Sequence, residues 1–405
     1  MQLPEANDDD FQDSVAELGR LAKTLGLAVV GTLVQKRPAL HVATYVGSGK
    51  IDELKAIVAA QDAEVVLVEH ELTPSQARTL ETTLEVPIMD RTGVILEIFH
   101  RHARSRAAKA QVEIVRLQYM APRMRELGAG ADRQRGGIGG KGAGESGMEL
   151  DRRKIRDRVA ELSAELAQLS TEAETQRSRR RDMHRVALVG YTNAGKSTLM
   201  RALTGSDVLV ADKLFATLDT TVRSLVPETR PKILLSDTVG FIDNLPHGLV
   251  ASFKSTLDEA LEASLLLHVI DASDRGWRRQ LGVTKDVLAE IGAGVIPRLL
   301  LFNKFDKVGD ATAQSVLAQR ILAEWPDAVI LSAKSSDDVR FLHDKLETHF
   351  RGDLVEDEIH VAYDRQHLRG VLYAECEVLG ERYDEAGIIF RVRATQAAIE
   401  RFRAP

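Results

Sequence analysis

The sequence predicts an α/β protein with an N-terminal α/β region, a long antiparallel helical hairpin, a central doubly wound domain with a mostly parallel sheet, and a small C-terminal α/β domain. Two observations support this fold class. Short apolar runs alternate with helical patterns before residue 97 and again after residue 184. Between these regions the spacing is helical, except where a glycine-rich segment interrupts it. We expect domains at residues 1–97, 98–183, 184–352 and 353–405.

Composition and targeting signals place the chain in a broad class. It has 44% hydrophobic and 28% charged residues, as globular proteins do. No apolar run approaches the roughly 18 residues that a membrane helix needs. The acidic start MQLPEANDDD lacks a signal-peptide pattern, and the single cysteine, Cys376, excludes an intramolecular disulfide. We therefore expect a cytoplasmic protein.

Charge is distributed unevenly. Residues 100–185 carry 20 Lys and Arg against 12 Asp and Glu, whereas the rest of the chain carries 34 against 48. The net charge of this segment is therefore +8, and that of the remainder is −14. Such asymmetry indicates a basic element on an acidic body and favours a contact with nucleic acid, although solvated helices are also rich in Arg and Glu.

The first region predicts short strands and helices in alternation. The strand candidates are AVVGTLV (28–34), EVVLVEH (64–70) and VPIMDR (86–91). KIDELKAIVAAQ (50–61) has helical spacing, and TPSQARTLETTL (73–84) begins with Thr73 before Pro74, as a capped helix does.

The hairpin is predicted from two apolar seams. The members of the seams lie three and four residues apart: Val112, Val115 and Tyr119, then Ile155, Val159, Leu162, Leu166 and Leu169. Two long helices joined by one loop usually pack antiparallel, so we expect an intramolecular seam and a monomer. Pro122 is expected to kink the first helix.

The glycine-rich loop 128–147 then lies at the tip of the hairpin. Its part RQRGGIGGKGAGESG (133–147) has seven glycines, with Arg133, Arg135 and Lys141. A domain linker, a phosphate-binding loop and a basic RNA-contacting finger all have this composition. A phosphate-binding loop would need glycine at 135 and Ser or Thr at 142, where the chain has Arg135 and Gly142. The tip position does not suit a linker.

Residues 184–352 predict the doubly wound domain. The strand candidates are RVALVG (185–190), KILLSDTVG (232–240), LLLHVIDAS (265–273), IPRLLLFNKFD (296–306) and AVILSAK (328–334). The last residues predict a strand (358–364), a helix, a second strand (386–394) and a short helix.

The most specific motif is GYTNAGKST, in which Gly190, Gly195, Lys196 and Ser197 fit G-x-x-x-x-G-K-[ST]. A strand precedes it and a helix follows, so main-chain N–H groups can surround phosphates. Lys196 is expected at the β- and γ-phosphates, and the Ser197 hydroxyl at Mg²⁺. The nucleotide-binding candidates here are Gly190, Tyr191, Thr192, Asn193, Ala194, Gly195, Lys196 and Ser197.

Three shorter motifs follow at predicted strand ends, where α/β sheets bind ligands. Asp237, Thr238, Val239 and Gly240 can hold Mg²⁺ through water and contact the γ-phosphate. Asn303, Lys304, Phe305 and Asp306 end another strand, and a carboxylate there can accept from N1–H and the 2-amino group of guanine. Ser332, Ala333 and Lys334 complete a base pocket. Because adenine lacks the N1–H and 2-amino donors of guanine, a carboxylate at Asp306 favours GTP over ATP.

With these residues in place, the chain resembles the HflX family of ribosome-associated GTPases. The matching stretches are YVGSGKIDEL, MDRTGVILEIFHRHARSRAAKAQVE, RGGIGGKGAGES with MELDRRKIRDR, GYTNAGKSTL, LFATLDTTVR, DTVGFIDNLPHGLVASFKSTLDE and NKFD. They cover roughly residues 40–310 and include segments outside the shared GTPase motifs.

The resemblance implies a P-loop GTPase that binds the large (50S) ribosomal subunit and acts in ribosome splitting or recycling, rescue or biogenesis. It implies that Phe215, Ala216, Thr217, Leu218 and Asp219 form switch I, with Thr217 as a second Mg²⁺ ligand. It also implies that the tip loop approaches the peptidyl-transferase region, with Arg133, Arg135 and Lys141 as candidate contacts to rRNA.

Two further features concern catalysis. Ras-type GTPases have a water-orienting glutamine directly after the glycine that corresponds to Gly240, and this chain has Phe241 there. Its catalytic group is therefore unknown, and slow hydrolysis alone with stimulation by the ribosome is expected. Asn193 gives the pattern G-x-x-N-x-G-K-S, which can hold K⁺ beside the phosphates. An ATP-driven RNA remodeller and a nucleotide-gated adaptor with negligible turnover remain alternatives.

Overall fold

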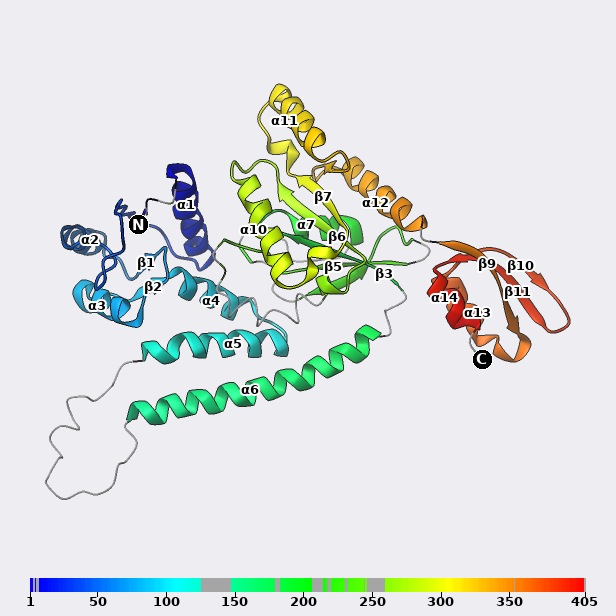
Figure 1. The fold of residues 1–405 in the computed structure, drawn as a ribbon, viewed down its shortest axis with the longest axis horizontal. Coiled ribbons are helices and arrows are strands. Elements are labelled where there is room, and N and C mark those ends of the chain that lie inside the picture. The colour runs from blue at the N-terminus through cyan, green and yellow to red at the C-terminus, as the bar shows by residue number, and fades with distance from the viewer. Residues whose placement is uncertain are drawn as a thin grey trace, which may run out of the picture. The chain divides into compact units, whose positions relative to one another are not determined.

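The computed structural model describes residues 1–2, 4, 7–124, 147–178, 183–205, 214–215, 217, 220–229, 232–243, 245, 259–352 and 354–403. The chain forms two compact units, one built mainly from Met1–Thr171 and the other mainly from Glu172–Asn244 and Lys254–Pro405. Both are mixed α/β (Figure 1). Among the described residues, no helix combines the length and the apolar character needed to cross a bilayer.

The first unit begins with a small α/β region. Two short parallel strands pair with Val66 opposite Ile88 and Val68 opposite Asp90. The predicted start of the helix at Pro74 is confirmed: the Thr73 side chain accepts from the Gln76 main-chain N–H, and the Gln76 side chain accepts in return from the Thr73 N–H. The elements are α1 (Asp8–Thr24), α2 (Ser48–Gln61), β1 (Val66–Val68), α3 (Pro74–Leu84), β2 (Ile88–Asp90) and α4 (Arg91–His102).

The apolar run 28–34 was predicted as a strand, and this prediction is wrong. Val29 and Val30 are 57% and 51% exposed. A cavity of about 220 Å³ is lined by residues of this run and of β1. The β-branched side chains favour a strand, but a strand also needs a hydrogen-bonded neighbour, and the run does not pair with β1.

The predicted helical hairpin is formed by α5 (Arg106–Met120) and α6 (Gly147–Ser178), which run antiparallel (Figure 1). Ala110 and Ile114 of α5 pack against Leu162 of α6, so the predicted seam Val112, Val115 and Tyr119 on α5 is wrong. Ser105 begins α5 by accepting from the Ala108 N–H. Pro122 lies in a 3₁₀ turn, η1 (Ala121–Arg123), after the helix has ended, so the predicted kink is absent. The tip residues 125–146 lie outside the described part of the chain.

The second unit contains the predicted doubly wound sheet, in the order β4-β5-β3-β6-β7-β8. All neighbours pair in parallel except β4 and β5, which are antiparallel. Sequence patterns did not identify β4, which is a short edge strand. The strands are β3 (His184–Gly190), β4 (Thr221–Ser224), β5 (Ile233–Asp237), β6 (Leu265–Asp271), β7 (Arg298–Asn303) and β8 (Val329–Ile330).

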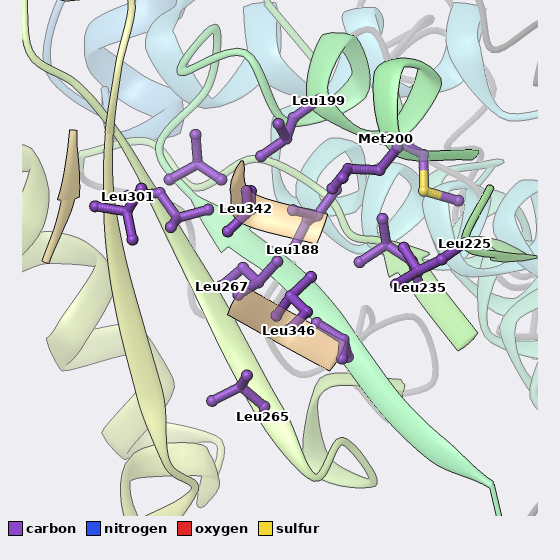
Figure 2. Packing of buried hydrophobic residues seen from close by; sticks show 14 of the residues in the cluster. Leu188, Leu199, Met200, Leu225, Leu235, Leu265, Leu267, Leu301, Leu342 and Leu346 are labelled. Atoms are coloured by element: carbon purple, nitrogen blue, oxygen red, sulfur yellow. The ribbon is translucent and has the colours of Figure 1, made fainter. Parts of the chain in front are cut away.

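Helices cover both faces of this sheet. On one face, leucines of the central strands pack against Leu199 and Met200 of α7 (Lys196–Thr204) and Leu342 and Leu346 of α12 (Ser336–Arg351), as Figure 2 shows. On the other face, Ile270 and Phe302 pack against α10 (Trp277–Glu290) and α11 (Ala311–Glu324). Burial on both faces explains the nearly continuous apolar runs of β3 and β6.

The C-terminal residues form an antiparallel sheet in the order β10-β11-β9 with two helices. The pattern predicted the strands near residues 358 and 386 and both helices, but it missed β10. Most side chains of β10 are exposed and its alternation is broken by a register shift between Val378 and Gly380, so no buried face appears in the sequence. The elements are β9 (Val355–Ala362), α13 (His367–Glu375), β10 (Glu377–Tyr383), β11 (Gly387–Ala394) and α14 (Gln396–Arg403).

One buried histidine of the central sheet predicts a dependence of stability on pH. His268 of β6 is 1% exposed, and its Nδ1 has no hydrogen-bond partner among the described residues. Burial, with repulsion from Arg298, Lys285 and Lys196, lowers the pKa of His268 to about 3. Below about pH 6.5 the unfolded chain binds a proton here and the folded chain does not, so stability is lost as the pH falls from 6.5 toward 3.

We expect wild type to lose up to about 1.4 kcal/mol of unfolding free energy per pH unit more than His268→Leu in this range. Urea unfolding at pH 7.5, 6.5 and 5.5 measures the difference. Tryptophan fluorescence reports this unit alone, because both tryptophans, Trp277 and Trp325, lie in its core. Equal pH slopes in wild type and variant would show that His268 does not control the dependence.

Candidate nucleotide-binding site

The phosphate-binding motif forms the turn between β3 and α7. Gly190 ends the strand and Lys196 begins the helix. Gly195 has a φ of +99°, and a Cβ atom there would clash with Nδ2 of Asn303. Glycine is therefore required by both backbone conformation and space. The loop thus leads to a helix N-terminus, where main-chain N–H groups can meet an anion.

Lys196 lies beneath this loop and is 6% exposed. Its Nζ donates to the main-chain oxygens of Gly190 (3.0 Å) and Tyr191 (2.9 Å). Burial lowers the pKa of Lys196 to about 8, and the Asp237 carboxylate partly offsets this effect. An anionic ligand beside Nζ would favour the charged form, because an opposite charge nearby stabilises an ammonium.

Three side-chain oxygens from separate segments meet below the loop. The Ser197 hydroxyl donates to Oδ2 of Asp237 (2.8 Å), the Thr217 hydroxyl donates to the same atom (2.9 Å), and the two hydroxyls are 2.8 Å apart. The three residues named as Mg²⁺ candidates are therefore brought together. Of the other switch I candidates, Phe215 is buried, whereas Ala216, Leu218 and Asp219 lie outside the described residues.

Asp237 supplies the test of whether this cluster suits a cation. It is fully buried, and its Oδ1 has no hydrogen-bond partner among the described residues. Burial raises the pKa of Asp237, while the charge of Lys196 and the two hydroxyl hydrogen bonds oppose the rise. A buried carboxylate with one unpaired oxygen and two neighbouring hydroxyls matches the hard oxygen donors that Mg²⁺ prefers. The residues fit the ion.

The segment after β5 is tied to the phosphate loop. The Phe241 N–H donates to the Gly190 oxygen (3.1 Å), and the Thr192 N–H donates to the Phe241 oxygen (2.7 Å). Thr238 donates to the Leu188 oxygen, and Val239 is buried. The Phe241 side chain is 2% exposed and lies in the protein interior. It supplies no group that can hydrogen-bond water.

The base-pocket motifs meet the phosphate loop through Asn303. Its Nδ2 donates to the Ala194 oxygen (2.8 Å), and its Oδ1 accepts from the Ala333 N–H (2.9 Å). This one amide links the motif at the end of β7 to the loop on one side and to the motif after β8 on the other. It is 1% exposed, so the link is protected from water.

The remaining members of these motifs lie at the surface or nearby. Asp306 and Lys334 are exposed, Phe305 is half-buried, and Ser332 is 7% exposed. Asn193 is exposed with a φ of 60°. Its side chain is therefore accessible to an ion, and binding of K⁺ there stays a prediction. The basic candidates Arg133, Arg135 and Lys141 lie outside the described residues.

Sequence reasoning missed two acidic residues that support the site. Asp338 accepts from the Ser332 N–H (2.7 Å) and thereby fixes the third motif. Its signal was the pair Ser335 and Asp338, since Ser335 begins α12 as its cap. Asp271, at the end of β6, contacts Nζ of Lys304 (2.7 Å). Its position at a strand end beside a nucleotide motif was the available signal.

Family models that match three successive parts of the chain agree with this arrangement. Residues 12–100 match the family model for a "GTP-binding GTPase N-terminal" region, residues 102–180 that for a "GTP-binding GTPase Middle Region", and residues 185–304 that for a "50S ribosome-binding GTPase". A solved complex of SsGBP with GDP is 26% identical with a TM-score of 0.48, and covers 84% of this chain and 95% of that chain.

Two relatives named GTPase HflX align over nearly the whole chain. That of Gluconacetobacter diazotrophicus is 51% identical and covers 100% of this chain and 96% of the relative. That of Escherichia coli K12 is 38% identical and covers 94% of this chain and 89% of the relative. Because such identity extends through all three matched regions and the P-loop geometry agrees with it, the chain belongs to the HflX family of GTPases, which bind and hydrolyse GTP.

Proposed function

We propose that this GTPase binds the large ribosomal subunit and uses GTP to control ribosome splitting or recycling, rescue or biogenesis. The observation that carries a switching role is the meeting of Ser197, Thr217 and Asp237, because they come from the phosphate loop, the segment before β4 and the end of β5. A ligand bound to all three can order two flanking segments together. The match of residues 185–304 to a 50S ribosome-binding GTPase supports the choice of partner.

Each residue receives a role in this proposal. The N–H groups of the phosphate loop and Lys196 bind the phosphates. Ser197 and Thr217 would hold Mg²⁺ directly, and Asp237 would hold it through water. When bound, the ion neutralises phosphate charge and orients the β- and γ-phosphates. Gly240 contacts the γ-phosphate, and its lack of a side chain matters, because a Cβ there would lie 2.9 Å from Nζ of Lys196.

The proposal keeps the four domains that the sequence predicts. Residues 184–352 form the GTPase domain, and residues 1–97 and 353–405 form α/β domains on either side of it in sequence. The hairpin of residues 98–183 carries the basic loop 128–147, which contacts rRNA. A ribosomal partner implies a cytoplasmic protein. The packing of α5 against α6 of the same chain supports a monomer. Phosphate contacts from Arg and Lys supply affinity that depends on salt.

Hydrolysis assays separate this proposal from its alternatives. We expect slow GTP turnover by the isolated protein, faster turnover with large subunits, and little turnover of ATP. Lys196→Ala should bind neither GDP nor GTP, because the buried ammonium that faces the phosphates is lost. Lys307→Ala is the matched control, since Lys307 is exposed in the turn η4 (Phe305–Lys307) beside the base motif.

The alternatives give different results. An RNA remodeller with a separate nucleotide site in the N-terminal domain would hydrolyse ATP with RNA, and this activity would survive in Lys196→Ala. An adaptor would bind subunits in a GTP-dependent manner without turnover. Tight nucleotide binding by folded Lys196→Ala would contradict the assigned site itself.

Monovalent cations provide a second test of catalysis. Because the Phe241 side chain cannot orient water, another group must stabilise the transition state. K⁺ held near Asn193 would do so in the way an arginine finger does. An arginine finger raises the rate of hydrolysis by on the order of 10³-fold. We expect faster GTP turnover in KCl than in NaCl for wild type, and no such advantage for Asn193→Ala. Rapid turnover by the isolated protein in NaCl would mean that a catalytic side chain is already present.

Base choice tests Asp306. Asp306→Asn is expected to shift preference from GTP toward XTP, because an amide can donate to the 2-oxo group of xanthine, whereas a carboxylate only accepts. The ability of GTP, XTP and ATP to displace a fluorescent nucleotide from the protein measures the shift. Asp310→Asn is the control, because Asp310 caps α11 and asparagine caps equally well. An unchanged preference for GTP would exclude Asp306 as the base reader.

Ribosome binding tests the basic loop. Replacing Arg133, Arg135 and Lys141 by alanine should weaken binding to large subunits and flatten its dependence on salt, without changing GTP affinity. Replacing Arg152, Arg153 and Lys154 removes the same charge from an exposed part of α6 and should have a smaller effect. Equal losses in the two triple variants would indicate general electrostatics instead of a loop contact.

A further inference from the structure

Lys304 joins the base side of the site to the phosphate loop. It has a φ of 58°, and its Nζ donates to the main-chain oxygen of Asn193 (2.5 Å). The same Nζ lies 2.7 Å from Oδ2 of Asp271, and the Lys304 side chain is 17% exposed. One ammonium therefore connects the phosphate loop, the end of β7 and the end of β6.

Asp271 is held firmly in this arrangement. It is the last residue of β6 and lies opposite Asn303 in the parallel register with β7. Its Oδ1 accepts from the N–H (3.0 Å) and the hydroxyl (2.6 Å) of Ser273, which leaves Oδ2 for Lys304. Its side chain is 15% exposed. The carboxylate therefore meets Lys304 with its position already fixed.

Charge explains why Lys304 needs this carboxylate. The positive charge of Lys304 contributes to the lowered pKa of Lys196, so the two ammonium groups repel each other. Without a neighbouring anion, Lys304 would keep one main-chain acceptor and would be driven toward water. An acceptor at Asn193 alone offers a neutral hydrogen bond, which is weaker than a charge-assisted pair.

We propose that Asp271 is a positioning residue for nucleotide binding, which holds the ammonium of Lys304 on the Asn193 oxygen and so keeps the base motif and the phosphate loop at a fixed separation. The inference rests on the proposed nucleotide site and adds a residue that touches no nucleotide. Fixing both halves in advance lowers the ordering cost of binding. Loss of the Asp271 contact should weaken the binding of GDP and GTP alike. It should leave base preference unchanged, because Asp306 is intact.

The experiment measures release of methylanthraniloyl-GDP from the full chain with Mg²⁺. Asp271→Asn keeps the shape of the side chain and removes its charge. We expect about tenfold faster release, the size of one lost charge-assisted hydrogen bond. Asp274→Asn is the matched control, since Asp274 lies in the same turn and bonds the Gly276 N–H instead of Lys304. Asp271→Glu retains the charge and should fall between wild type and Asp271→Asn.

A double-variant cycle separates positioning from general stability. If Asp271 acts through Lys304, then Asp271→Asn with Lys304→Met releases GDP no faster than Lys304→Met alone. A multiplied effect, or wild-type release by Asp271→Asn, overturns the proposal. Tryptophan fluorescence unfolding identifies a variant that fails to fold, and Lys304→Met with wild-type Asp271 then still tests the contact: unchanged release by it also overturns the proposal.

The result for Lys196→Ala separates failure of the proposed nucleotide site from failure of the positioning role of Asp271. If that variant binds GDP tightly, the proposed site is wrong. If it loses binding while Asp271→Asn behaves as wild type, the site stands and only the positioning role of Asp271 is rejected.

Discussion

Parallel pairing of β3 with β5 and β6 is the constraint on which the candidate site depends. The register places Leu188 opposite Asp237 and Gly190 opposite Val269, and the next pair along the sheet places Asp271 opposite Asn303. Parallel strands end at one edge of a sheet, so residues distant in sequence come together there. The phosphate loop leaves β3 between its two neighbours, where the strand order reverses. The chemistry of the site therefore follows from the topology of the sheet.

This topology also concentrates charge in a place that water does not reach. Lys196 and Asp237 are both buried, and burial shifts their pKa values in opposite directions, lower for the ammonium and higher for the carboxylate. Each shift disfavours the charged form. A polyanion beside Lys196 and a divalent cation beside Asp237 would reverse both. Mg²⁺ and a nucleotide phosphate would thus suit the two groups as a pair, and each would help the other to bind.

Much of this arrangement could be predicted from the sequence, because the decisive signals are local. The complete P-loop pattern, the acidic residue ending β5 and the asparagine ending β7 each stand beside an apolar run that marks a buried strand. The hairpin could be predicted as well, although only the α6 seam was placed correctly: Val159, Leu162 and Leu166 pack against α5. These features depend on short-range spacing and on burial at both faces of one sheet, which the chain displays directly.

The features that were missed or mistaken depend on a partner elsewhere in the chain. The side chains of β4 are mostly half-buried and those of β10 mostly exposed, so the pairing of these strands leaves little trace in their own residues. Residues 28–34 have the composition of a strand and lack a ladder neighbour. The roles of Asp271, at the end of β6, and Asp338, in the first turn of α12, could not be predicted, because an acidic residue at such a position has many uses. Their contacts appear only when β6, β7 and α12 are in place.

The contacts of Phe241 show how a residue without catalytic chemistry can still belong to the switching apparatus. Its main chain exchanges hydrogen bonds with Gly190 and Thr192 of the phosphate loop, and the Asp243 N–H donates to the Tyr191 hydroxyl. The residues after β5 cannot move away from the loop without breaking these bonds. Gly240, next to Phe241, also packs against Lys196 and Thr192. Under the proposed function, a phosphate group that entered between Gly240 and Lys196 would act on the segment after β5, and the start of that segment would respond directly to what the phosphate loop holds.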